Sequence, residues 1–231
     1  MLSAIAIIPS APVLVPELTG LAGAEVADLR SAVVAAASSL PNHWVGIGVG
    51  PEDQVAGPDA VGTFAGFGVD VQVRLAPALG EQPGPPSDLP LCALLAGWVR
   101  GQVRPAATAK IQVYAHGRES EDALVQGKLL RAEIDRTADP VGVLVVADGV
   151  NTLTPSAPGG YDPTGAPAQL LLDDALAGGD VAALARLPER VLGRPAFQVL
   201  AGLCGAGPRS ATELYRGAPF GVGCFVGVWQ P

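Results

Sequence analysis

The amino-acid sequence predicts an α/β fold, a single-domain three-layer sandwich in which helices flank a mostly parallel central sheet. Short apolar segments alternate with amphipathic segments along the chain, as strands alternate with helices in this class. Hydrophobic residues make up 49% of the 231 residues and charged residues only 16%. This apolar balance favours a sheet that is buried on both faces, and the length suffices for a substantial core.

Six segments are expected to be strands because they are short and are either apolar or alternating. Residues 141–146 are apolar throughout, as in a fully buried strand, whereas residues 69–75 alternate and indicate a half-exposed one. In chain order, the expected strands cover residues 4–9, 44–49, 69–75, 111–115, 141–146 and 220–229.

Six further segments are expected to be helices. Leu91, Leu94, Leu95 and Trp98 form one face at helical spacing. Glycines 178 and 179 end one helix, and the following Asp180 can cap the next. In chain order, the expected helices are residues 24–39, a segment from Leu91, a segment capped near Ser120, and residues 166–177, 180–186 and 189–203.

The Pro/Gly-rich segment 76–88 is the only candidate linker, and we expect it to be a loop. The elements on either side of it look like parts of one sheet. Residues 1–231 are therefore expected to form a single domain.

The charge pattern argues against two classes of partner. The net charge is -8, and the 14 lysines and arginines are spread along the chain without a basic cluster. Nucleic acid and anionic membranes are therefore not expected partners. No apolar run reaches the ~20 residues of a membrane span, and no basic stretch precedes the apolar N-terminus, so we expect a cytoplasmic protein.

The three cysteines, Cys92, Cys204 and Cys224, are widely spaced and lie in apolar patterns. Without a Cys-x-x-Cys pair they do not indicate a zinc site, and we expect them to be buried. The glycines of "GIGVGPED" do not open a helix, as a dinucleotide fingerprint requires, so nucleotide binding is not predicted.

Polar residues follow several predicted strands, where α/β folds bind their ligands. They are Ser10, Glu52 with Asp53, His116, and the start of the long loop 148–165, which includes Asp148 and Asn151. One interpretation is ordinary turns and a surface histidine. The other is a site in which Glu52, Asp53 and Asp148 hold a hard cation, Mg²⁺ or Ca²⁺, with His116 as a base.

Three blocks of sequence, in this order, are similar to the class III extradiol ring-cleavage dioxygenases of the catalytic B-subunit type and their stand-alone bacterial relatives. They are "IIPSAPVLVPEL", "ADGVNTLTPSAPGGYDPTG" and "APFGVGCFVGVW". The resemblance touches both ends and the middle of the chain. It implies the α/β sandwich, a site at the strand ends, and self-association, so a homodimer is expected.

In that family two early histidines and a glutamate hold ferrous iron, and a later histidine is the acid/base. By resemblance, the first ligand position is Ser10, and the second falls at or next to Glu52, after Pro51. The acid/base position is Asn151, and the glutamate position falls near Val191. The chain therefore departs from the family at every catalytic position.

A serine hydroxyl is a poor iron ligand, valine is none, and asparagine cannot exchange a proton near neutral pH. The resemblance therefore implies a degenerate member that has no catalytic iron. Its vestigial pocket, formed by Ser10, Glu52, Asp148, Asn151 and Val191, would bind a small molecule or a protein partner. Two alternatives stay open: an enzyme repurposed around carboxylates and a hard cation, and a residual ring-cleavage dioxygenase.

Overall fold

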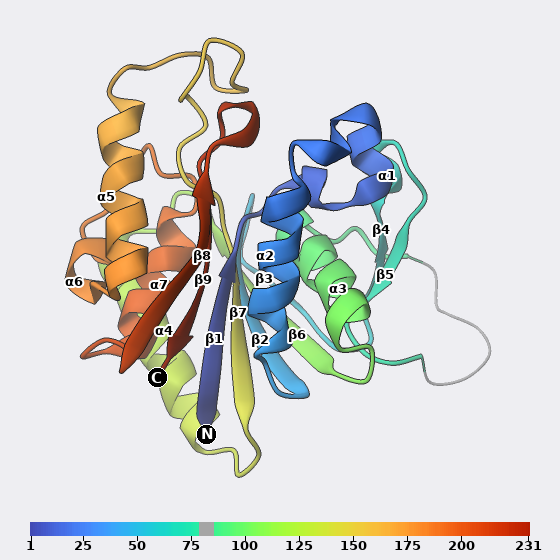
Figure 1. Ribbon diagram of the computed structural model, residues 1–231. Coiled ribbons are helices and arrows are strands. Elements are labelled where there is room, and N and C mark those ends of the chain that lie inside the picture. Colours follow the sequence, from blue (N-terminus) through green and yellow to red (C-terminus); the bar gives the residue numbers. More distant parts are fainter. Residues whose placement is uncertain (79–85) are drawn as a thin grey trace.

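The computed structural model describes residues 1–78 and 86–231, and its centre is a seven-stranded sheet in the order β3-β6-β2-β7-β1-β9-β8 (Figure 1). The strands of this sheet are β1 (Leu2–Ile8), β2 (His43–Gly50), β3 (Gln54–Ala56), β6 (Thr108–Ala115), β7 (Val141–Val146), β8 (Ser210–Gly217) and β9 (Cys224–Gln230). Two short strands, β4 (Val61–Thr63) and β5 (Gln72–Arg74), form a separate antiparallel pair.

The sheet is parallel at its centre and antiparallel at its edges. Strands β6, β2, β7 and β1 are neighbours and run in the same direction. Strand β9 lies antiparallel to β1, β8 antiparallel to β9, and β3 antiparallel to β6. The carboxyl ends of four adjacent strands therefore meet at one edge of the sheet, while both chain termini lie at the opposite end (Figure 1).

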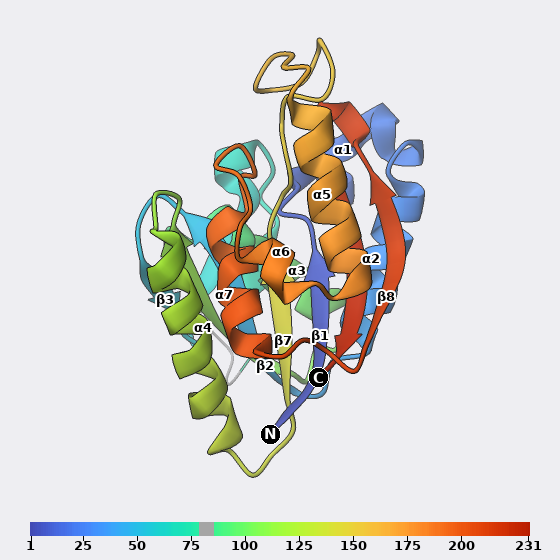
Figure 2. The same cartoon turned by 90° about the vertical axis from the view of Figure 1, so that its left-hand side faces the viewer.

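Helices cover both faces of the sheet. Helices α2 and α3 lie on one face, and α4, α5, α6 and α7 lie on the other, where they face the viewer in Figure 2. The helices are α1 (Pro16–Thr19), α2 (Ala27–Ser38), α3 (Leu91–Val103), α4 (Ser120–Asp135), α5 (Gly165–Gly178), α6 (Val181–Leu184) and α7 (Arg194–Cys204), with short 3₁₀ turns at Pro12–Leu14, Gly20–Ala24, Phe64–Phe67 and Pro219–Gly221.

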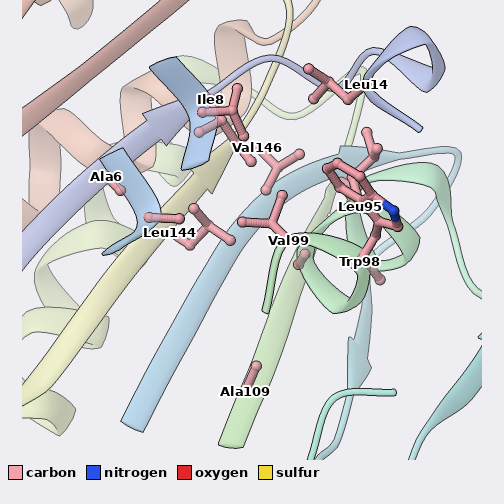
Figure 3. Close-up of a cluster of buried hydrophobic side chains, with 14 of the residues drawn as sticks. Ala6, Ile8, Leu14, Leu95, Trp98, Val99, Ala109, Leu144 and Val146 are labelled. Atoms are coloured by element: carbon pink, nitrogen blue, oxygen red, sulfur yellow. The ribbon is translucent and has the colours of Figure 1, made fainter. Parts of the chain in front are cut away.

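The core is divided by the sheet into two clusters because side chains alternate along each strand. In β1, Ala6 and Ile8 pack with α2 and α3, whereas Ile5 and Ile7 pack with the helices of the other face. Figure 3 shows the first cluster, in which Ile8 and Val146 lie beside side chains of α3 such as Leu95. Such burial fixes the central strands and so the positions of their ends.

Most predicted elements are present, and several boundaries differ. Within the expected strand 69–75, only β5 forms, and it pairs with β4 outside the central sheet. The prediction that the elements on both sides of residues 76–88 belong to one sheet was therefore wrong for the segment before residue 76. The last helix begins at Arg194 instead of 189, and the last strand begins at Cys224 instead of 220. The sequence analysis missed the edge strands β3 and β8 and the short strand β4, which carry little of the apolar pattern of a buried strand.

Two capping predictions had different outcomes. Asp180 does cap α6, because its Oδ1 accepts a hydrogen bond from the N–H of Ala183 at 2.9 Å. Ser120 does not cap α4: it is the first helical residue, and its hydroxyl accepts a hydrogen bond from Gln198 Nε2 instead. The three cysteines are buried, as predicted.

None of the helices within residues 1–78 and 86–231 has both the length and the apolar character that a membrane span requires.

Candidate functional site

A cavity of about 400 Å³ opens at the carboxyl ends of the four parallel strands. Ser10 follows β1, Pro51 follows β2, His116 follows β6 and Asp148 comes shortly after β7. The remaining wall is mostly apolar and comes from the ends of strands, the 3₁₀ turn at Phe67, the segment before α3 and the segment before α7: Val49, Gly50, Phe67, Asp88, Leu89, Pro90, Leu91, Val146, Ala147, Leu192 and Gly193. Its volume is in the usual range for small-molecule sites.

Ser10 and Asp148 lie 138 residues apart in the sequence and touch in the fold. The backbone N–H of Ser10 donates a hydrogen bond to Asp148 Oδ1 at 2.8 Å. Strands β1 and β7 are parallel neighbours, and Ile8 pairs with Val146, so both chains leave the sheet side by side. The hydrogen bond fixes one carboxyl oxygen in the wall of the cavity.

The Asp148 carboxyl is poorly compensated. Burial raises its pKa to about 7, against a smaller lowering effect of the Ser10 N–H. Within residues 1–78 and 86–231, its oxygens accept no second hydrogen bond and meet no basic side chain. Asp148 is half-buried, and a carboxylate that loses water without gaining a cation is costly.

A buried amide holds the backbone that follows Asp148. Gln169 of α5 accepts the N–H of Val150 at 2.8 Å through Oε1 and donates through Nε2 to Asp173 at 2.8 Å. Gly149 and Gly223 leave room for it, because a Cβ at either position would lie within about 2 Å of the Gln169 amide. The sequence analysis missed Gln169, although a glutamine in an apolar helix following a polar loop was a usable signal.

The start of α7 closes the other side of the cavity. The N–H of Gly193 donates to the backbone carbonyl of Asp148 at 2.8 Å, and the N–H of Leu192 donates to that of Gly149 at 3.1 Å. A Cβ on Gly193 would lie 2.6 Å from the Cβ of Ala147, so only glycine allows this close approach. The N-terminus of α7 is therefore fastened to the loop that carries Asp148.

Glu52 and Asp53 do not line the cavity, which corrects their predicted places beside Asp148. Pro51 takes the strand-end position, and Glu52 is exposed on the turn beyond it. Asp53 instead forms an ion pair with Arg118 and accepts the N–H of Ala115 at 2.7 Å. Its negative charge is therefore paired with Arg118, which also pairs with Asp122.

Asn151 and Val191 also lie off the cavity, contrary to the predicted pocket. Asn151 is turned toward Gly159, where an added Cβ would meet its Oδ1 at 2.6 Å. Val191 is 1% exposed and packs in the core. Residues 189–193, which were expected to be the first residues of the helix, form turns that precede α7. The residues after Val191, Leu192 and Gly193, reach the cavity in its place.

Of the predicted residues, the structure brings Ser10, Asp148 and His116 together around one cavity. His116 is exposed, and its backbone N–H donates to the carbonyl of Gly50 at 3.0 Å. Phe67 and Asp88 were missed because they come from a turn and a loop that are distant in sequence from the strand ends and carry no motif.

The side chains around the cavity do not fit an iron centre of two histidines and one carboxylate. The wall offers one imidazole, His116, and the positions that the resemblance assigns to ligands carry a hydroxyl, a proline or exposed glutamate, and a buried valine. Among the described residues, no group of three or more histidine, cysteine, aspartate or glutamate side chains is arranged to hold a metal ion.

Comparison with known proteins supports the fold and leaves the activity open. No family model matches the chain, and no curated protein matches it. A crystal structure of the uncharacterized protein JW3007 from Escherichia coli K12 is similar to it, with a TM-score of 0.57 and 12% sequence identity. The match covers 99% of this chain and 100% of that chain. At this identity the likeness shows a shared mixed α/β fold alone.

Proposed function

We propose that this chain is a non-catalytic protein of the class III extradiol dioxygenase type, a single-domain three-layer sandwich that binds a small molecule at its strand ends. The observation that carries the proposal is the cavity of about 400 Å³ lined by Ser10 and Asp148, where the described lining residues include a single imidazole, that of His116. The cavity supports binding, and the donor set argues against the parent reaction.

The arrangement of the three family-like blocks also supports the proposal. The first block meets the second through Ser10 and Asp148. The second meets the third through backbone hydrogen bonds, in which Gly149 donates to Gly223 at 2.9 Å and Gly223 donates to Val150 at 2.8 Å. Three segments that are far apart in the sequence thus meet near Ser10 and Asp148. This is the region in which the family resemblance predicts a binding site.

Obstruction of the cavity tests binding directly. Leu192 lines the cavity and is 38% exposed, so Leu192→Trp adds bulk to the wall without overfilling the core. Leu171→Trp on α5 is the matched control, because Leu171 is similarly exposed and does not line the cavity. A fragment library is screened by amide chemical-shift changes in the full-length protein.

We expect fragments that shift the amides of Ser10, Asp148 and Gly193, and we expect Leu192→Trp, but not Leu171→Trp, to abolish those shifts. If no fragment perturbs these amides, or if Leu192→Trp leaves the binding intact, the proposed binding site is wrong.

Metal analysis tests the non-catalytic part of the proposal. Protein purified in the presence of ferrous iron should retain far less than one equivalent, and oxygen uptake with a panel of catechols should equal that of heat-killed protein. Tightly held stoichiometric iron, or catechol-dependent oxygen uptake, would return the chain to the ring-cleaving class.

A further inference from the structure

The charges around the cavity indicate which ligands it can accept. Its wall carries two carboxyl groups, Asp148 inside and Asp88 at the exposed rim, and the described lining residues include no lysine or arginine. The protein as a whole has a net charge of -8. An anionic ligand would therefore meet only like charge from these side chains, whereas a cation would be attracted.

The basic side chains near this edge of the sheet are committed elsewhere. Arg118 forms ion pairs with Asp53 and Asp122. Arg194 follows Gly193 directly, yet its guanidinium donates toward the hydroxyl of Ser120 and the carbonyl of Arg118, each at 3.4 Å. Asp148 thus gains no internal cation from either arginine, and its second carboxyl oxygen is left for whatever occupies the cavity.

Two helices begin at the cavity, and a helix N-terminus can favour an anion. Here part of that capacity is used or missing. In α7 the N–H of Arg194 already donates to Val191 at 3.0 Å, and Pro195 has no N–H. In α3 the N-cap residue is Pro90, which likewise has no N–H to offer. The full negative charge of an ionised Asp148 also exceeds the charge of roughly +0.5 at a helix N-terminus.

The apolar side chains of the cavity wall determine what kind of ligand body fits there. Val49, Phe67, Leu89, Leu91 and Leu192 give the cavity an apolar lining. We propose, on the basis of the proposed binding function, that the cavity takes a small primary amine with an apolar or aromatic body, whose ammonium group pairs with Asp148. The ammonium supplies the donors and the positive charge that Asp148 lacks, and a charge-assisted hydrogen bond is stronger than a neutral one.

Three probes that share one body and differ in the head group test this inference. They are 2-phenylethylamine, 2-phenylethanol and phenylacetate, titrated into the full-length protein by calorimetry at pH 8 and low salt. We expect the amine to bind about tenfold more tightly than the alcohol, and we expect the carboxylate to bind more weakly than the alcohol.

Two variants assign the preference to the carboxyl group. Asp148→Asn keeps the shape and an oxygen for the Ser10 N–H, and we expect it to bind the amine and the alcohol equally. Asp174→Asn is the matched control, because Asp174 of α5 pairs with Arg216 of β8 and does not line the cavity. This variant should keep the wild-type preference for the amine. Far-UV circular dichroism confirms that both variants are folded.

The outcomes separate this inference from the proposed function. The inference is overturned if the alcohol or the carboxylate binds as tightly as the amine, if Asp148→Asn keeps the preference, or if no probe binds while other fragments still shift the cavity amides. In each of those cases the cavity remains a binding site. If no fragment of any charge shifts those amides, the proposed function fails as well.

Discussion

Asp148 and Asp53 follow neighbouring strands, β7 and β2, at the same edge of the sheet, yet their environments are opposite. Asp53 is exposed and is balanced by Arg118 and by the N–H of Ala115. Asp148 is held inside the cavity by one N–H, that of Ser10, and faces apolar side chains. A balanced carboxylate joins two parts of the fold, whereas an unbalanced one is a candidate binding group.

The largest expected effect comes from the amide that supports the Asp148 corner. Gln169→Leu removes the acceptor of the Val150 N–H and the donor to Asp173, and leaves both partners buried. We expect the free energy of unfolding to fall by about 3 kcal/mol, measured by urea denaturation. Gln102→Leu on the exposed face of α3 is the control and should change stability by less than about 0.5 kcal/mol. Equal effects of the two substitutions would show that Gln169 does not support this corner.

The next largest effect is a stabilisation, and it is expected from Asp148→Asn. The pKa of Asp148 is higher in the folded chain, about 7, than its ordinary value of 3.8. The folded state therefore binds the proton more tightly, and this carboxyl lowers stability increasingly as the pH rises from about 4 through 7. Asp148→Asn removes that effect, so we expect it to raise the free energy of unfolding at pH 8 by about 2 kcal/mol.

The comparison is made by urea denaturation of the wild type and Asp148→Asn between pH 4 and pH 8. The gain from the substitution should shrink steadily as the pH falls and should be absent near pH 4. A gain that is independent of pH, or a loss at pH 8, would mean that the carboxyl is compensated in the folded protein.

The smallest effect belongs to the balanced corner. Asp53→Asn keeps an acceptor for the Ala115 N–H and loses the ion pair with Arg118. The contribution of this ion pair is expected to be small because the Asp53 side chain is exposed to water. We expect a destabilisation of about 0.5–1 kcal/mol, and this difference should decrease in 1 M salt because exposed charges are screened. A destabilisation larger than that of Gln169→Leu would reverse the contrast between the two corners.

Much of the architecture could be predicted from the sequence. The apolar segment Val141–Val146 proved to be a strand buried on both faces. On α3, Leu94, Leu95 and Trp98 are buried as predicted, but Leu91 is half-buried at the cavity, and the helix is buried continuously from Cys92 to Arg100 and not on one face alone. Local patterns sufficed to predict the type of these elements, because a short continuous apolar run and an apolar stripe can both be recognised without knowing the tertiary structure. The exposed edge strand β8 carries no such pattern, and β5 alternates as a sheet strand does although it lies outside the central sheet.

The candidate site was predictable only in part. The rule that ligands collect at the ends of parallel strands identified Ser10, His116 and Asp148. It could not show that Pro51 replaces Glu52 at the cavity, or that Leu192 and Gly193 replace Val191, because a change of one or two residues at a turn reverses which side chain faces inward. Phe67 and Asp88 came from segments that no local pattern connects to the strand ends.

The sequence by itself determined the alternation of strands and helices and the polar residues that leave the strands, because periodicity and turn chemistry are local properties. Only the tertiary structure decided which of the three carboxylates, Glu52, Asp53 and Asp148, pairs with a basic side chain. Asp53 lies beside Arg118, Glu52 faces solvent, and Asp148 lies against apolar walls. The electrostatic state of a carboxyl group depends on neighbours that are distant in the sequence and on the water that packing excludes.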